Sequence, residues 1–204
     1  MKLRFPVLLF AALLAAPVLT PAFGQDAEDL LSPPSDLPRA EHGEPTYSLD
    51  TLFGALKIAP DETSAKAIEN QIWAAWIESG SDTCDLLMTR VKDAIGDKDY
   101  DLAIRLLNSI IAIKPGYVEA WNQRATVYYL KDDYPRAIAD IAEVLAREPR
   151  QFGALAGLGL MLQDIGDDKD ALEAYRKALA VDPHLENIPD VVKTLTEKVE
   201  GRDI

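Results

Sequence analysis

Few residues in this chain could carry chemistry, and they do not cluster. The sequence contains two histidines and one cysteine among 204 residues. His42 lies in a proline-rich stretch, and His184 directly follows Pro183. Around neither histidine do cysteines or carboxylates stand at the spacing of a metal site, beyond the acids that are usual in turns. The sequence therefore predicts no metal centre.

Two short segments imitate ligand-binding loops but lack residues that such loops need. The run 97–101 resembles the opening of a calcium loop, yet Leu102 replaces the required glycine and Asn108 replaces the bidentate acid. Gly157 and Gly159 follow no predicted strand, and the third glycine of a nucleotide-binding loop is missing. A nucleophile elbow is also absent from the sequence. We therefore expect a protein that is not an enzyme and that uses no cofactor.

The strongest pattern is a repeat of 34 residues, and the elements that it specifies must position any functional residues of the chain. Prolines, small residues and large apolar residues return at this interval: Pro115, Pro149 and Pro183; Ala103, Ala137 and Ala171; Leu87, Trp121 and Leu155; Leu107, Ile141 and Tyr175. Such a period indicates stacked structural repeats, none of which can bury its apolar face alone. Because stacked repeats leave a long open surface, the pattern favours a protein that holds a partner.

Each unit has the pattern of two helices joined by a tight turn. Between residues 117 and 131 the apolar residues fall on one helical face: Val118, Trp121, Ala125, Tyr128 and Tyr129. Pro135 suits the first turn of a second helix, which must end before Pro149. Ala137 is small at the point where two antiparallel helices would come closest. The spacing therefore predicts a helical hairpin in each unit.

This pattern resembles the tetratricopeptide repeat. The middle unit matches its consensus at Trp121, Ala125, Tyr128, Ala137, Ile141 and Pro149. The third unit matches equally well, whereas the first is weaker because Val91 replaces the usual glycine or alanine. The three units cover about 84–117, 118–151 and 152–185, within a repeat region spanning 82–185. The resemblance implies an all-α fold, namely a right-handed superhelix of helical hairpins, with nine helices in all.

In the tetratricopeptide family, the first helix of each hairpin lines a concave groove that binds a protein or peptide. Carried over to this sequence, the groove residues are Met88, Lys92, Asn122, Thr126, Tyr129, Ala156, Leu160 and Gln163. This lining mixes small, apolar and neutral polar side chains. We expect Asn122, Tyr129 and Leu160 to face solvent, with Trp121 buried beside them.

The family's clamp of lysine, arginine and asparagine for a peptide carboxylate is not reproduced in this groove. Ala156 and Gly157 stand where the cations would be needed. Arg90 and Arg124 occupy equivalent places in neighbouring units. Either arginine could reach a ligand, but pairing with an acid of a neighbouring helix, such as Asp140, is the more common fate of such residues.

Helical patterns also flank the repeats. Residues 48–81 have the length of one more hairpin, but Glu69 stands where the small residue belongs, so we expect a divergent first unit or an N-terminal cap. Trp73 and Trp76 could form a ligand platform, although aromatic residues at helical spacing more commonly belong to the core. The segment 186–204 is predicted to contain a C-terminal cap helix with the apolar stripe Ile188, Val191, Val192, Leu195 and Val199.

The start of the chain has the three-part pattern of a secretory signal peptide at 1–24. A basic start is followed by an apolar run at 5–16 and by a small-x-small cleavage site at 22–24. A membrane anchor is the alternative, but the run is shorter than the roughly 20 residues that a span needs and is flanked by prolines. Residues 25–47, rich in proline and acids, are expected to be a disordered leader. We therefore expect an exported protein with no stable membrane insertion after cleavage.

The chain is strongly acidic. Its formal net charge is −13, which becomes −15 without Lys2 and Arg4 of the signal peptide. Such a charge disfavours nucleic acid and anionic membranes as partners, and it favours solubility or a basic partner. The simpler explanation is that acids cap helices at the turns, as expected for Asp97, Asp99, Asp132, Asp167 and Asp168. Cys84 has no second cysteine to bridge, so it is either buried or paired between chains, and its apolar neighbours favour burial.

The whole arrangement resembles a group of small periplasmic tetratricopeptide proteins of Gram-negative, alphaproteobacterial type. The resemblance implies an interaction protein that serves envelope integrity or cell-wall assembly. Two hypotheses remain open. The chain is either an adaptor that binds a polypeptide in its groove, or a structural homo-oligomer that pairs through its N-terminal hairpin or cap helix. An enzyme or a metal carrier is a distant third.

Overall fold

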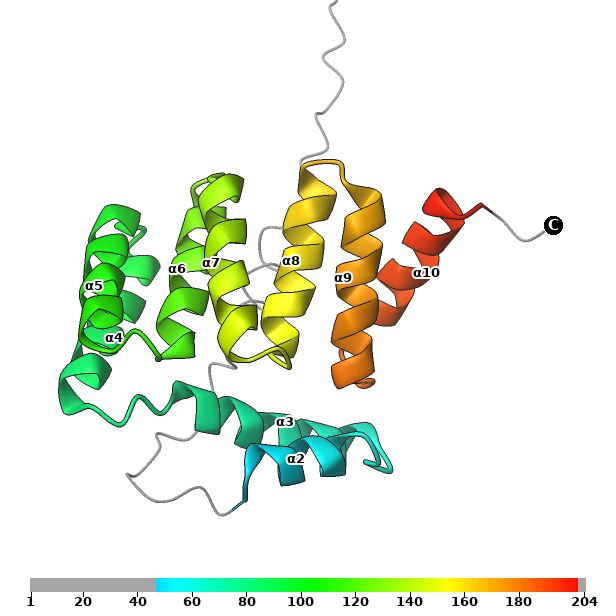
Figure 1. Cartoon of the computed structure of the whole chain (residues 1–204), viewed down its shortest axis with the longest axis horizontal. Helices are drawn as coiled ribbons and strands as arrows, with labels where there is room; N and C mark the ends of the chain where they lie inside the picture. The colour runs from blue at the N-terminus through cyan, green and yellow to red at the C-terminus, as the bar shows by residue number, and fades with distance from the viewer. Residues whose placement is uncertain (1–46, 202–204) are drawn as a thin grey trace, which may run out of the picture.

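The computed structural model describes residues 47–201. In this range the chain forms nine helices and no strand, as the sequence predicts (Figure 1). The helices are α2 (Leu49–Leu56), α3 (Glu62–Ile77), α4 (Asp82–Gly96), α5 (Tyr100–Ile113), α6 (Val118–Leu130), α7 (Tyr134–Arg147), α8 (Phe152–Asp164), α9 (Asp168–Val181) and α10 (Ile188–Val199). The predicted signal peptide at 1–24 and almost all of the predicted leader at 25–47 lie outside the described residues.

The second helix of each repeat hairpin begins at an aspartate. The carboxylates of Asp99, Asp133 and Asp167 accept hydrogen bonds from the backbone N–H three residues further on, at 3.0, 3.3 and 3.2 Å. The residue before each of these caps has a positive φ: 58° at Lys98, 56° at Asp132 and 86° at Gly166. The turn geometry therefore repeats every 34 residues. Of the acids expected to cap helices, Asp99 and Asp167 are N-caps and Asp133 takes the role expected of Asp132, while Asp97 follows the last residue of α4 and Asp168 is the first residue of α9.

Three antiparallel hairpins, α4–α5, α6–α7 and α8–α9, stand in one row (Figure 1). Small residues lie where their helices approach most closely: Ala103, Ala137 and Ala171 are all 0% exposed. Gly159 of α8 faces the ring of Tyr175 of α9, and a Cβ added at residue 159 would lie 2.7 Å from two of its ring carbons. The predicted hairpin register is therefore confirmed.

Replacing Ala137 with leucine is expected to lower the free energy of unfolding by about 1–3 kcal/mol, because the extra atoms must enter a filled contact. Ala137 packs in one cluster with Ala125, Tyr128 and Ile141. Urea melts should show the loss. Ala139→Leu is the matched control, since Ala139 is exposed on the same helix and its replacement should change stability by less than about 0.5 kcal/mol. Equal midpoints for the two variants would contradict the packing described above.

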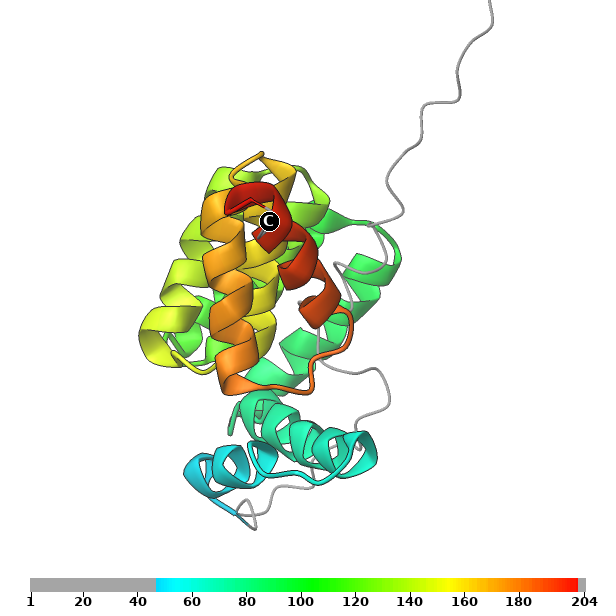
Figure 2. The same ribbon diagram turned by 90° about the vertical axis from the view of Figure 1, so that its right-hand side faces the viewer.

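The N-terminal hairpin, α2–α3, does not continue the row. It crosses beneath the ends of the repeat helices, with α3 extending from below α6 to below α9 (Figures 1 and 2). Its apolar side chains form one cluster with Phe152 at the start of α8, with Val181 at the end of α9 and with Leu185 in the following loop. The predicted divergent N-terminal hairpin is therefore present, but its expected place as a first unit or end cap of the row is not observed, because it packs on apolar residues at the hairpin ends.

The two tryptophans of α3 belong to this contact. Trp73 is 4% exposed and Trp76 is 7% exposed. Their rings lie 5.6 and 5.3 Å, centroid to centroid, from the ring of Phe152. The hydroxyl of Tyr117 donates a 2.6 Å hydrogen bond to the carbonyl of Ile77 at the end of α3. The tryptophans are therefore core residues, as the sequence favours, and not an open platform.

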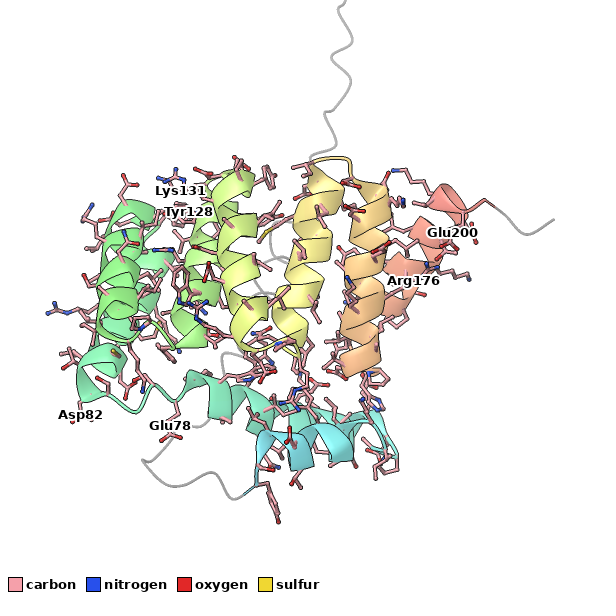
Figure 3. All side chains as sticks on the ribbon, in the orientation of Figure 1. Glu78, Asp82, Tyr128, Lys131, Arg176 and Glu200 are labelled. Atoms are coloured by element: carbon pink, nitrogen blue, oxygen red, sulfur yellow. The ribbon has the colours of Figure 1, made fainter. Side chains whose placement is uncertain are left out.

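The last helix, α10, covers the far end of the row. Ile188 and Leu195 are 1% and 2% exposed and pack with Leu155 of α8 and Tyr175 of α9. Arg176 of α9 points towards Glu200 at the end of α10 and pairs with it at 2.7 Å (Figure 3). The predicted cap helix is therefore confirmed.

Two further expectations concern single features of the chain. Cys84 is 0% exposed inside α4, as its apolar neighbours predict. Among residues 47–201, no helix combines the length and the apolar character that crossing a membrane requires.

Candidate partner-binding groove

The eight residues predicted to line the groove lie on α4, α6 and α8, the first helices of the three hairpins. Five of them are buried, namely Met88, Asn122, Thr126, Ala156 and Leu160; Tyr129 and Gln163 are half-buried, and Lys92 is exposed. The expectation that Asn122 and Leu160 face solvent is therefore wrong. Lys92, Tyr129 and Gln163 retain exposed surface.

The cap helix explains why the α8 part of the predicted lining is buried. Ala156 and Leu160 belong to the same apolar cluster as Ile188 and Leu195 of α10. A leucine in that cluster contributes to folding, because burying its side chain removes apolar surface from water. Leu160 is therefore a packing residue, and its truncation would destabilise the fold as well as alter any groove.

The α6 part of the predicted lining is polar yet buried. Glu119 is 2% exposed and accepts hydrogen bonds from the side-chain amides of Asn122 at 3.2 Å and Gln123 at 2.7 Å. One turn further, the hydroxyl of Thr126 donates to the carbonyl of Asn122 at 3.1 Å. These four side chains form what we call the α6 polar network, which holds a carboxylate in a fixed position on this helix.

Two members of this network, Glu119 and Gln123, were not predicted from the sequence. Glu119 precedes Asn122 by three residues and Thr126 by seven, so the three share one helical face. That spacing could have indicated the network. An acid in the first turn of a helix is, however, usually an exposed partner of the helix dipole, and the sequence alone favours that role.

Burial controls the protonation of Glu119. Removal from water raises the pKa of this carboxyl to about 7, while the amides of Gln123 and Asn122 and the charge of Lys92 act in the opposite direction. Burial also raises the pKa of Tyr117, with a further contribution from the charge of Glu119. The α6 polar network therefore contains a carboxyl that changes charge near neutral pH.

This pKa predicts a pH dependence of stability. An acid whose pKa is higher in the folded than in the unfolded state stabilises the fold when protonated, so stability should fall as the pH rises from about 4.5 to 7. The loss due to Glu119 should reach at most about 3 kcal/mol. Asp182, whose pKa burial raises to about 6, adds a loss of the same sign. Urea midpoints at pH 5 and pH 8 test this.

Glu119→Gln is the variant that isolates this effect. Its side-chain carbonyl can still accept one of the two amide hydrogen bonds, but the side chain cannot ionise. The difference between the two midpoints should therefore shrink in the variant relative to the parent protein. If the difference is unchanged, Glu119 does not titrate in this range.

Polar groups on the other predicted groove residues are held by neighbouring helices. The hydroxyl of Tyr129 donates to the carboxylate of Asp164 at 2.8 Å, and the hydroxyl of Tyr175 donates to the side-chain carbonyl of Gln163 at 3.3 Å. These bonds fix the half-buried side chains of Tyr129 and Gln163 on successive hairpins. With the cation of Lys92, these groups offer hydrogen bonds and one positive charge to a partner.

Arg124 pairs with Asp140, as the sequence favours. Its guanidinium donates two hydrogen bonds to that carboxylate, at 2.7 and 2.8 Å. Its centre also lies 4.9 Å from the ring of Trp121, which has Arg147 at 4.8 Å. Trp121 is therefore half-buried between two arginines, and the expectation of full burial is wrong. Arg90, in the equivalent place, is exposed.

The described part of the chain contains no cluster of three or more histidine, cysteine or acidic side chains arranged to hold a metal ion. The Asp97–Asp101 run serves the turn between α4 and α5, where Asp99 caps α5. Asp101 forms an ion pair with Lys131 of α6 at 2.7 Å. The acids that imitate a calcium loop therefore have structural roles.

Comparison with known proteins finds tetratricopeptide repeats. One model of this repeat matches residues 94–159, and a second matches residues 152–185. A tetratricopeptide repeat-containing protein of Rhizobium etli is 38% identical over 163 residues, which cover 80% of this chain and 80% of that protein.

Solved structures of tetratricopeptide domains have the same fold. The domain of Sgt2 from Aspergillus fumigatus superimposes with a TM-score of 0.54 at 25% identity, covering 59% of this chain and 81% of that domain. The first domain of Spaghetti (RPAP3), bound to an HSP90 peptide, gives a TM-score of 0.55 at 16% identity, covering 59% of this chain and 95% of that domain. With its 34-residue hairpins, its all-α superhelix and its Rhizobium etli relative, this chain belongs to the tetratricopeptide repeat family.

Proposed function

We propose that this protein is a non-catalytic interaction module that binds a segment of another polypeptide along α4, α6 and α8. The observation that carries the proposal is the row of polar groups on successive hairpins: Lys92 on α4, Tyr129 on α6 and Gln163 on α8. The RPAP3 domain binds a peptide on the same fold. The groups on this chain differ from a carboxylate clamp, so we expect an internal segment of the partner and not a chaperone tail.

The proposed place of action is the periplasm. The basic start, apolar run and small-residue cleavage site at 1–24 support export. The process that we propose, envelope integrity or cell-wall assembly, is the one implied by the resemblance to small periplasmic tetratricopeptide proteins. Cell fractionation and mass spectrometry of the N-terminus test this directly. We expect a periplasmic protein that begins at Gln25.

Partner binding can be tested with a double variant that spares the core. Lys92→Ala with Gln163→Ala removes exposed or half-exposed side chains from two hairpins and should weaken binding about tenfold, a loss of about 1.4 kcal/mol for the two contacts together. The partner is first identified by placing a photo-cross-linking amino acid at residue 92 in living cells. Affinity for that partner is then measured with both proteins purified, and circular dichroism should show unchanged helicity.

The matched control is Arg105→Ala with Lys177→Ala. Both side chains are exposed, but they lie on α5 and α9, the second helices of their hairpins. This control should bind the partner as the parent protein does. If the control loses binding and the groove variant retains it, the partner occupies the other face of the row.

A structural homo-oligomer is the alternative function. The burial of Trp73 and Trp76 against Phe152 removes the aromatic surface through which the N-terminal hairpin was expected to pair. Light scattering of the purified protein distinguishes the two functions, because the adaptor needs no second copy. A stable oligomer that loses partner binding when it dissociates would favour the alternative.

A further inference from the structure

A cavity lies between the N-terminal hairpin and the repeats, away from the groove proposed above. Its volume is about 270 Å³, and it is lined by Asp50, Phe53, Gly54 and Lys57 of the α2 hairpin together with Arg150 and Val181. Ligand pockets usually measure roughly 300–1,000 Å³. The size of this cavity therefore suits one amino-acid side chain better than a whole ligand.

Gly54 keeps this cavity open. It lies inside α2, where glycine is about 1 kcal/mol less favourable than alanine. Nothing in the packing demands a glycine there, because a Cβ added at residue 54 would meet no atom within 4 Å, and its φ is not positive. The added side chain would instead extend towards the space that Gly54 lines. The missing side chain at residue 54 thus lowers the stability of the helix and leaves the cavity unfilled.

The charges around the cavity favour an anion at its edge. The central guanidinium carbon of Arg150 lies over Phe53, 4.4 Å from the ring centroid, and its charge is neutralised by Asp50 at 2.6 Å and Glu148 at 3.2 Å. Lys57 also lines the cavity, and no ion pair joins it to another described residue. The remaining lining, Phe53 and Val181, is apolar. The cavity therefore combines an apolar interior with one cation that is available to a ligand.

We propose that this cavity binds the C-terminal residue of a polypeptide, with an apolar side chain inside and the terminal carboxylate at Lys57. A free chain end is the occupant that combines these two groups within one residue. The neighbouring Ile58, 80% exposed, offers apolar surface to the residues that precede the chain end. This site lies outside the groove and does not depend on the function proposed for it.

The test is a titration of the purified ¹⁵N-labelled protein with N-acetyl-leucine, followed by NMR. Signals of Gly54 and Lys57 should shift with a Kd of about 1 mM, as expected for a ligand of this size. N-acetyl-leucinamide should bind at least about tenfold more weakly, because it lacks the charge that Lys57 would meet. Equal binding of the acid and the amide would overturn the proposal, as would the absence of any shift at these residues.

Two glycine variants separate the cavity from general effects on the fold. Gly54→Leu should abolish the shifts by filling the cavity, and its thermal midpoint should not fall, since leucine favours helices. Gly96→Leu is the matched control at the end of α4, where an added Cβ also meets no atom within 4 Å. That control should keep the affinity of the parent protein. Retained binding by Gly54→Leu would place the ligand elsewhere.

A third probe identifies the source of the carboxylate. Hexanoate carries a carboxylate and an apolar chain but no amide, so it stands for a free organic acid. A peptide end should bind more tightly than hexanoate, because its amide and preceding residues add contacts. Tighter binding of hexanoate than of N-acetyl-leucine would overturn the assignment to a chain end.

Discussion

Replacing Phe152 with alanine is expected to lower the free energy of unfolding by about 3–5 kcal/mol, the usual cost of truncating a buried aromatic residue. Phe152 is 2% exposed, and its ring contacts the rings of both Trp73 and Trp76. It starts α8, so its loss removes the main aromatic contact between the repeats and the N-terminal hairpin. Aromatic pairs stabilise a fold beyond the area that they bury. Removing this one ring should therefore weaken the packing of both tryptophans.

The measurement is urea unfolding followed in parallel by circular dichroism and by tryptophan fluorescence. We expect the fluorescence to change at lower urea than the helicity, since two of the three tryptophans, Trp73 and Trp76, report on α3 while most helices lie in the repeats. Phe152→Leu is the control, because it keeps most of the apolar volume and should cost less than about 1.5 kcal/mol. Coincident transitions at the midpoint of the parent protein would show that the hairpin does not depend on this residue.

Replacing Tyr175 with alanine is expected to cost a similar amount, about 3–5 kcal/mol, for a reason within a single hairpin. Tyr175 is 1% exposed, and its ring fills the space left by the missing side chain of Gly159. Without the ring, α8 and α9 would face each other across a cavity. Helices that pack through side chains cannot close such a gap fully, so the lost contacts are not recovered.

Tyr175→Phe is the control that separates packing from hydrogen bonding. It keeps the ring and removes only the 3.3 Å bond to the half-buried Gln163, so stability should fall by about 0.5–1.5 kcal/mol. Thermal and urea unfolding of both variants provide the comparison. If Tyr175→Phe lowers the free energy of unfolding as much as Tyr175→Ala does, the hydroxyl and not the ring stabilises the hairpin.

Local patterns were sufficient to predict each repeat. Ala137 and Pro149 lie within one 34-residue unit, and the contacts that they specify join residues close together in the sequence. The pair formed by Arg124 and Asp140, 16 residues apart, was predictable for the same reason. Within such a span, helical periodicity and turn chemistry determine which side chains meet.

The position of the N-terminal hairpin was not predictable in this way. Its contacts join residues far apart in the sequence, as in the ion pair of Asp50 with Arg150, which are separated by 100 residues. The apolar stripe of α3 shows that one face must be covered, but not by what. The periodicity of the repeats favours a continued row. The N-terminal hairpin instead packs against apolar residues at the hairpin ends, such as Phe152.

The candidate site was likewise predictable in part, from local spacing, and in part not. Helical spacing correctly assigned Lys92, Asn122 and Leu160 to the first helices of their hairpins, but it did not predict which of them would be exposed. Leu160 is buried because a separate helix, α10, packs in its cluster. Asn122 is buried in a polar network with Glu119, whose environment raises the pKa of that carboxyl to about 7.

The sequence by itself determined the helices, the hairpin register and the family, because these depend on spacing within units of 34 residues. Only the tertiary structure decided how the N-terminal hairpin crosses the row, which groove residues keep exposed surface, and that Gly54 lines a cavity. The physical reason is that burial and charge at a residue depend on every element packed against it. Elements such as α3 and α10 reach the repeats through contacts that no local period records.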